Sequence, residues 1–246
     1  IIKKIIDKEE IMFKKNICAV AVLALFTGCV QKDLSMNTYD LANHWFNVKS
    51  LNENKIVLNK NFTQQYNDGS RTSAYTDFNI YKKNKTDLNQ IELYTFFEDI
   101  NKQNYKTMLS TKSVDLKYNI FQNDIKENFH VDEQQISSYK RNIKIKDKVI
   151  EESDVDGNML VCTFSNYYET MSIKDKVNEF FNSKYSVTDK NYDNVMELSC
   201  KDSYVDGEYH IYFAEDIGTV LFVRKDRDDG SLEETYSILD TQTIME

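Results

Sequence analysis

The stretch EYHIYFAEDIGTVLFVRKD (208–226) decides the fold, because two runs rich in β-branched and aromatic residues flank a short bend. SLEETYSIL (231–239) follows with the same composition, after the polar turn Asp228-Asp229-Gly230. Short runs of this kind, separated by turn residues, are typical of neighbouring antiparallel strands. The C-terminal part of the chain is therefore predicted to form an antiparallel meander.

The same pattern continues toward the N-terminus. Further strands are expected at residues 54–66, 73–83, 89–100, 104–113, 113–122, 143–153, 158–168 and 193–201. Residues 123–141 are ambiguous, and VDEQQISSYKR (131–141) within them could form one or two helical turns. The predicted fold class is mainly β (α+β): an antiparallel β meander or a partly closed barrel with one or two short helices.

One helix has a clear start. Ser172 and Asp175 have the spacing of a capping box with Asp in place of Glu. Ile173, Val177 and Phe181 follow at intervals of four and form a single apolar stripe. We expect a helix from about residue 173 to 183.

The N-terminal region has the three parts of a secretory signal. Met12-Phe13-Lys14-Lys15 is basic, residues 17–26 are apolar, and the small pair Thr27-Gly28 precedes Cys29. The apolar run is too short to span a bilayer, which needs about 20 residues. We expect a signal peptide at 12–28, a polar tether at 29–38 and a strand-rich domain at 39–246, either single or divided near 140–150.

The segment around Cys29 resembles the lipobox of bacterial lipoproteins, although Phe26 stands where that family prefers Leu. The resemblance covers residues 12–29 and implies that a diacylglyceryl group is attached to Cys29, which becomes the new N-terminus. It implies a protein of the bacterial cell envelope, anchored in a membrane through Cys29. In that family, Asp directly after the cysteine often marks retention in the inner membrane. Here Val30 follows Cys29, so the resemblance implies the outer membrane, facing the periplasm or the surface. An ordinary secretory signal with an incidental cysteine is the alternative.

Residues 1–11 precede a complete signal that starts at Met12. The segment from Asp7 to Met12 can be encoded as GAT AAG GAG GAA ATT ATG, in which AGGAGG stands shortly before ATG. We expect residues 1–11 to be an untranslated leader and Met12 to be the start. A genuine N-terminal extension is the alternative.

Two cysteines of the expected domain have apolar neighbours at alternate positions. In MLVCTF (159–164) and VMELSC (195–200), Cys162 and Cys200 share a strand face with apolar side chains. Export places them where disulfides persist, which favours a Cys162–Cys200 bridge. A pair of buried free thiols is the alternative.

Two further stretches resemble known proteins. YHIYFAEDIGTVLFVRKD (209–226) resembles the closing hairpin of bacterial lipoproteins of unknown function, which implies no activity. LANHWFNVKSL (41–51) loosely resembles the opening Gly-x-Trp strand of lipocalin-like barrels, with Asn43 in place of Gly. The alternative is that Trp45 simply fills the core.

Catalytic motifs are missing from the sequence. His44, His130 and His210 stand singly, without metal-binding spacing, and His210 is expected at a solvent face or sheet rim. DVDG (154–157) reads as a hairpin turn, because the Gly and Glu that a calcium loop requires further on are absent. There is no GxSxG and no phosphate-binding Gly loop. No catalytic residue, metal or cofactor is therefore expected.

Charge and composition restrict the partners. The formal net charge of −9 argues against binding to nucleic acid. The aromatic content of 13% fits packed sheets, and a sugar-stacking surface is the less favoured explanation. The adjacent carboxylates Glu151-Glu152 and Glu233-Glu234 would point to opposite faces of a strand and make poor acid–base partners.

Two functions from different classes remain. The first is a non-catalytic binding or assembly module for a partner protein or for an apolar ligand in a β cavity. The second is an envelope hydrolase that uses carboxylates. A concave, aromatic-lined sheet without convergent carboxylates would favour the first. Two carboxyl groups about 5–10 Å apart in a cleft would favour the second.

Overall fold

The computed structural model describes residues 37–100, 103–129, 135–153, 159–203, 207–228 and 231–246. Residues Ser35–Glu246 form one compact unit. The expected signal, Cys29, His130 and the DVDG turn lie outside the described residues.

The described part of the chain contains a sheet of twelve antiparallel strands, in the order β7-β6-β5-β4-β3-β2-β14-β13-β12-β11-β10-β9. Its strands are β2 (Ile56–Asn67), β3 (Ser70–Lys83), β4 (Gln90–Phe96), β5 (Leu116–Ile120), β6 (Asp124–Phe129), β7 (Gln135–Lys140), β9 (Lys148–Ser153), β10 (Met159–Ser172), β11 (Asn191–Asp202), β12 (Gly207–Ala214), β13 (Gly218–Asp228) and β14 (Ser231–Met245). β1 (Tyr39–Asp40) and β8 (Asn142–Ile143) pair separately.

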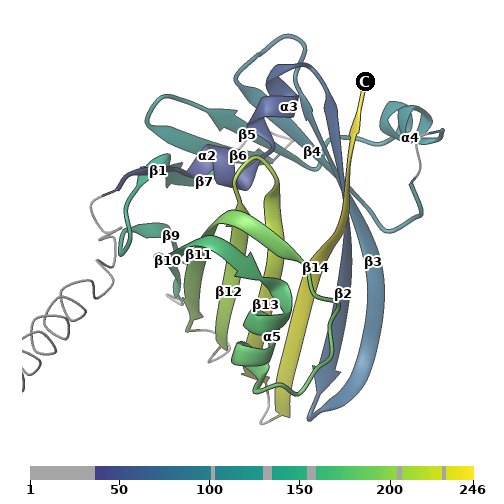
Figure 1. The fold of residues 1–246 in the computed structure, drawn as a ribbon. Coiled ribbons are helices and arrows are strands. Elements are labelled where there is room, and N and C mark those ends of the chain that lie inside the picture. The colour runs from purple at the N-terminus through teal and green to yellow at the C-terminus, as the bar shows by residue number, and fades with distance from the viewer. Residues whose placement is uncertain (1–36, 101–102, 130–134, 154–158, 204–206, 229–230) are drawn as a thin grey trace, which may run out of the picture. The chain divides into compact units, whose positions relative to one another are not determined.

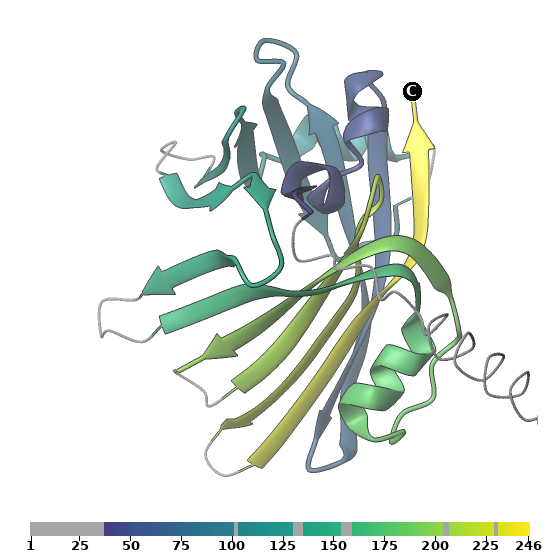
Figure 2. The same ribbon diagram turned by 60° about the vertical axis from the view of Figure 1, so that its left-hand side comes forward.

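The sheet curls until its two edge strands meet. Ser137 and Tyr139 of β7 both donate hydrogen bonds to Glu152 of β9, and the Tyr139 bond measures 3.4 Å. The result is a nearly closed barrel, whose strands curve around one concave face (Figures 1 and 2). The predicted mainly β fold, with a meander that closes partly into a barrel, is confirmed.

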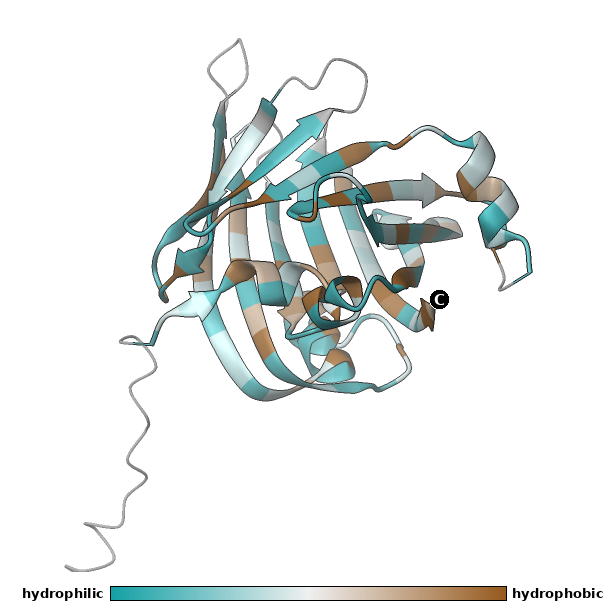
Figure 3. Ribbon diagram, turned by 90° about the horizontal axis from the view of Figure 1, so that it is seen from above, coloured by the Kyte–Doolittle hydropathy of each residue, from teal (hydrophilic) through white to brown (hydrophobic). Residues whose placement is uncertain are grey.

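Helices cover both faces of this sheet. The short helices α2 (Leu41–Trp45) and α3 (Val48–Asn52) pack on the concave face. Leu41, Leu51 and, directly after α2, Phe46 join a core to which β2, β4 to β7 and β9 to β12 contribute. The helix α5 (Ile173–Phe181) packs on the convex face of β11 to β14. Figure 3 shows how polar and apolar residues alternate along the strands, so that each face receives its own set.

The predicted helix start is confirmed. Ser172 is the N-cap of α5, and its hydroxyl accepts a hydrogen bond of 3.0 Å from the Asp175 amide. Ile173, Val177 and Phe181 are all buried. The helix ends at Phe181, two residues earlier than expected, because Asn182 adopts the left-handed conformation with φ 54°.

The strand that the lipocalin-like resemblance implies at 41–51 is not formed, since this stretch forms α2 and α3. Side-chain caps start both helices: Asp40 accepts a hydrogen bond from the Ala42 amide and Asn47 accepts one from the Ser50 amide, both at 3.0 Å. Trp45 nevertheless fills the core, with its ring centroid 4.8 Å from that of Tyr139.

One strand assignment is wrong, and one ambiguous stretch proves to be a strand. Residues 104–113 were expected in a strand, but Tyr105–Thr111 form α4, because Tyr105, Met108 and Leu109 recur at helical spacing and pack on one outer cluster. Within the ambiguous stretch 123–141, Asp124–Phe129 form β6 and Gln135–Lys140 form β7, which pairs with it, so the described part of this stretch contains no helical turn. Pairing with β6, rather than local propensity, makes β7 a strand.

The predicted disulfide is present. Cys162 and Cys200 face each other in the register of β10 and β11, with their sulfurs 2.08 Å apart. Both residues are fully buried in the same core cluster as Met196 and Leu198. The bridge therefore fastens two neighbouring strands from the inside of the barrel.

Candidate functional site

The concave face holds a cavity of about 510 Å³, called the concave cavity below. Its floor is built by β3, β2, β14 and β13, and residues at the end of β4 add to one side. This volume falls in the range of about 300–1,000 Å³ that small-molecule sites occupy. Polar side chains dominate its lining, among them Asn59, Asn61, Thr63, Asp77, Asn79 and Ser237.

The polar lining follows from a period of two in the sequence. On β2, Asn59, Asn61, Thr63 and Gln65 line the concave cavity, whereas the residues between them face the convex side. Sequence reasoning identified the strand but missed this polar stripe. The alternation of NKNFTQQ (59–65) was the signal that could have revealed it.

Hydrogen bonds across the strands hold this lining in place. The Asp77 carboxylate accepts from Asn61 Nδ2 at 2.9 Å and from Asn79 Nδ2 at 3.2 Å. Asn79 Oδ1 in turn accepts from Thr95 Oγ1 at 3.0 Å. Side chains fixed in this way are preorganised for a ligand rather than free to collapse.

One glutamine connects the cavity to the pair of short helices α2 and α3, called the helical plug below. Gln242 Nε2 donates to Asn59 Oδ1 at 2.9 Å and to the Ile217 carbonyl at 2.8 Å. Its Oε1 accepts from Asn47 Nδ2 at 2.9 Å, and Asn47 is the N-cap of α3. Gln242 thus ties the lining residue Asn59 to α3 and to the β12–β13 hairpin.

Aromatic rings supply most of the apolar part of the lining. Tyr75 and Phe97 stand at the rim with exposed fractions of 40% and 75%, and their centroids lie 6.5 Å apart in an edge-to-face arrangement. Tyr81 and Phe222 also line the cavity and are less exposed than these two. Burial raises the pKa of Tyr81 to about 12, so its hydroxyl stays neutral at physiological pH.

Charge is scarce in the concave cavity. Asp77 is the one carboxylate among the described lining residues, and Arg224 is the one cation. Arg224 forms an ion pair with Asp226, which is only 2% exposed. The arrangement offers many neutral donors and acceptors but no pair of converging acids.

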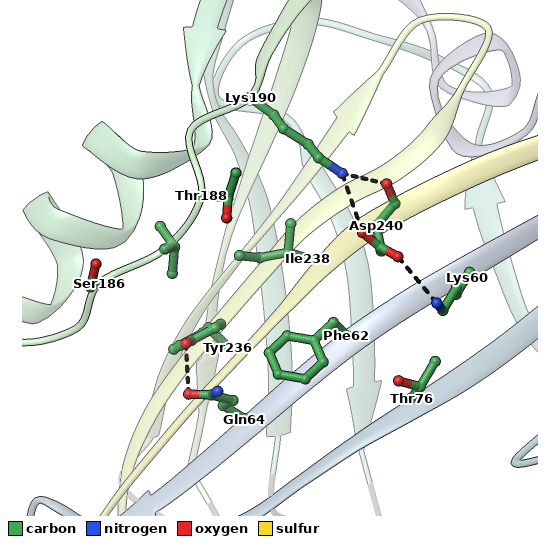
Figure 4. Close-up of a pocket in the computed structure, with 11 residues that line it drawn as sticks. Lys60, Phe62, Gln64, Thr76, Ser186, Thr188, Lys190, Tyr236, Ile238 and Asp240 are labelled. Carbon is green, nitrogen blue, oxygen red and sulfur yellow. Dashed lines mark hydrogen bonds and ion pairs between the residues drawn. The ribbon is translucent and has the colours of Figure 1, made fainter.

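A smaller cavity of about 300 Å³, the outer pocket, lies on the convex face (Figure 4). Phe62 and Ile238 line its middle, and at one end Tyr236 donates to Gln64 at 2.7 Å. At the other end the Asp240 carboxylate lies 3.4 Å from Lys60 Nζ and 3.7 Å from Lys190 Nζ. The single Asp240 carboxylate offsets one of the two lysine charges, so this end of the outer pocket keeps a net positive charge.

Two carboxylates do approach each other, at the seam where β7 meets β9. Tyr139 Oη donates to Glu127 Oε2 at 2.5 Å and to Glu152 Oε1 at 3.4 Å. Tyr139 is 5% exposed, and neither glutamate lines the concave cavity or the outer pocket. The pair braces the seam and has no described cleft that would bring a substrate to it.

The adjacent carboxylates behave as the sequence predicts. Glu233 is exposed, whereas Glu234 is 2% exposed on the opposite face of β14. Glu234 contacts Lys184 and accepts a hydrogen bond of 2.5 Å from Tyr185. Glu234 thus fastens the segment after α5 to the sheet.

The expected position of His210 is wrong, because α5 covers it. Its side chain is 17% exposed, and Nδ1 lies 2.5 Å from Glu197 Oε1. Phe180 of α5 packs edge-on against its ring at 5.2 Å. Tyr168 also donates to Glu197 at 2.5 Å, which makes the group a bridge between the sheet and the helix.

The pKa shifts of Glu197 and His210 both favour the charged form of the side chain. Burial opposes ionisation of both groups, but hydrogen bonds outweigh it: the pKa of Glu197 is lowered by His210 and Tyr168, and that of His210 is raised by Glu197 and Glu208. Lys176 on α5 also lowers the pKa of Glu197. The folded state therefore favours Glu197 as carboxylate and His210 as imidazolium.

We expect this pair to make stability depend on pH. The contribution of His210 is complete below its ordinary pKa of 6.5 and is lost as the pH rises through the raised value. That of Glu197 is complete above 4.5 and is lost as the pH falls through the lowered value. Between pH 5.5 and pH 8.5, the free energy of unfolding, measured with urea, should fall less in His210→Gln than in the wild type. An equal loss in both proteins would contradict this assignment.

Cys29 lies outside the described residues, and Cys162 and Cys200 are bridged in the core, away from either cavity. In the described ranges, no three His, Cys, Asp or Glu side chains are grouped so that they could hold a metal ion. No helix in the described part of the chain is long and apolar enough to cross a membrane. No family model, no curated protein and no solved structure matches this chain.

Proposed function

We propose that this chain is a non-catalytic binding module of the bacterial cell envelope, anchored to the outer membrane through lipidated Cys29. The concave cavity is the proposed ligand site. The observation that carries the proposal is its lining of preorganised neutral donors and acceptors, in which Asp77 is the one carboxylate among the described residues.

The cavity favours binding over hydrolysis. Glycoside hydrolysis needs two carboxyl groups facing one bond, one as the acid and one as the base or nucleophile. Asp77 has no second carboxylate beside it among the described lining residues. The side-chain amides of Asn61 and Asn79 already donate hydrogen bonds to the Asp77 carboxylate. The proposed role is therefore recognition without chemistry.

The cavity also favours a polar ligand over an apolar one. Apolar side chains of α2 and α3, such as Phe46 and Leu51, fill the apolar part of the interior. The open cavity has apolar side chains as well, but its many amides and hydroxyls would lose hydrogen bonds with water against a hydrocarbon.

Photo-crosslinking in cells that produce the full chain tests both parts of the proposal. p-Benzoylphenylalanine in place of Tyr75 would face the concave cavity, and the same residue in place of Ala74 is the matched control. Neighbours on a strand point to opposite faces, and Tyr75, not Ala74, lines the cavity. We expect a ligand adduct from position 75, recovered in the membrane fraction, and none from position 74.

A second arm carries Cys29→Ser, which removes the anchor. Because two or more acyl chains hold a protein firmly on a membrane, this variant should move to the soluble fraction while its adduct from position 75 persists. Equal adducts from both positions, or none from position 75, would contradict the binding site. Wild-type protein in the soluble fraction would contradict the anchor.

A further inference from the structure

We propose that the ligand of the concave cavity is a neutral saccharide chain. This inference rests on the proposed function, since it names the chemical class that the same site recognises. Four features of the cavity lead to it: its charge, its side-chain chemistry, its position in the sheet and its aromatic rim.

The charge of the lining excludes a strongly ionic ligand. Asp77 and Arg224 are the charged groups among the described lining residues, and the carboxylate of Asp226 already neutralises Arg224. A phosphorylated or polyanionic ligand would meet no free cluster of cations there. A polycation would meet only the Asp77 carboxylate.

The side-chain chemistry matches hydroxyl groups. A sugar hydroxyl both donates and accepts, and Asn, Gln, Ser and Thr side chains offer both functions within one group. Asp77 holds Asn61 and Asn79 through their Nδ2 atoms, which leaves Asn61 Oδ1 as an acceptor toward the cavity. The Thr235 hydroxyl lines the same space without a side-chain partner among the described residues.

The position of the cavity in the sheet disfavours an extended peptide. Peptides that bind sheets add a strand to a free edge and use main-chain hydrogen bonds for affinity. The floor strands β3, β2, β14 and β13 are all paired on both sides, and the free edges β7 and β9 lie at the seam. A ligand here must bind side chains only, as a saccharide does.

The aromatic rim supplies the remaining contact. Tyr75 and Phe97 expose their rings beside the amides of the lining. Because Phe97 is 75% exposed, its ring contributes little to the stability of the fold. A sugar ring has an apolar face of C–H groups as well as polar hydroxyls at its edge. Rings at the rim with amides on the floor would contact both parts at once.

Calorimetric titration of the full chain, in a detergent without a sugar headgroup, tests the inference. The probes are cellohexaose, maltohexaose and chitohexaose, and a neutral Gly-Ser-Asn repeat peptide of similar length is the comparison. We expect at least one saccharide to bind and the peptide not to bind. Phe97→Ala should weaken saccharide binding by about tenfold.

The matched control is Phe121→Ala, since Phe121 is also exposed, at 46%, but does not line the cavity. Neither substitution removes a buried side chain, so both variants should fold. Saccharide binding that Phe97→Ala leaves unchanged, or binding of none of the three saccharides, would overturn the inference. Binding of the peptide alone would overturn the saccharide class but not the proposed binding function. The crosslinked adduct from position 75 tests that binding function separately.

Discussion

Replacing Cys162 and Cys200 together by alanine is expected to lower the free energy of unfolding by about 4 kcal/mol. The bridge joins positions 38 residues apart, and in the chain-entropy model a loop of that length loses this much unfolded-state freedom. Both sulfurs are fully buried, so alanine removes the bridge without placing a polar group in the core. For a domain of this size the midpoint of thermal unfolding should fall by roughly 8–16 °C.

Urea unfolding monitored by the single tryptophan, Trp45, gives the measurement. The comparison is the wild-type protein unfolded with and without a reductant. Reduced wild type and the double variant should have similar stability, which separates the bridge from the packing of two small side chains. A double variant within about 1 kcal/mol of the oxidised protein would show that the bridge contributes little.

The disulfide and most strands were predictable because each depends on short-range alternation. MLVCTF and VMELSC each place a cysteine among apolar residues of one face, and the register of β10 and β11 then sets Cys162 opposite Cys200. Helix α5 was predictable for the same reason, since Ser172 and a stripe of three buried residues lie within ten positions. These signals do not need the rest of the chain.

The short helices could not be assigned from the sequence with equal ease. α2 and α3 have five residues each, too few for a helical period to stand out from a strand. Their caps, Asp40 and Asn47, are recognisable only when the helix is already suspected. What stabilises them is burial of Phe46 and Leu51 in a barrel that the sequence does not display.

The candidate site depends on contacts between distant parts of the chain. The polar stripe of β2 is an ordinary solvent-facing strand face until β14 pairs beside it, which brings Ser237 opposite Thr63. Their hydroxyls then hydrogen-bond at 2.9 Å, across 174 positions of sequence. Only when the sheet curls does this face become the lining of a cavity. Sequence alternation predicts which residues share a face, but not that the face is concave.

The position of the helical plug leads to the second prediction. The hairpin between β12 and β13 is docked on α2 by a hydrogen bond of 2.8 Å from the Asp216 amide to the Asn43 carbonyl. Gly218 follows with φ +102°, and a Cβ atom there would lie 2.9 Å from the backbone carbonyl oxygen of Trp45. A side chain at this position therefore meets both an unfavourable dihedral angle and a backbone clash that no rotamer relieves.

Gly218→Ala should lower the free energy of unfolding by about 3 kcal/mol, and Gly69→Ala by about 1 kcal/mol. Gly69 is the matched control, since its φ is also positive, at +81°, but a Cβ there approaches only the flexible end of Lys184 at 3.4 Å. The difference between the two variants isolates the contact with α2. Because α2 carries Trp45, Gly218→Ala should also shift the tryptophan emission of the folded protein, and Gly69→Ala should not. Equal destabilisation by both substitutions would mean that backbone conformation alone, and not the close contact with the Trp45 carbonyl of α2, requires glycine at position 218.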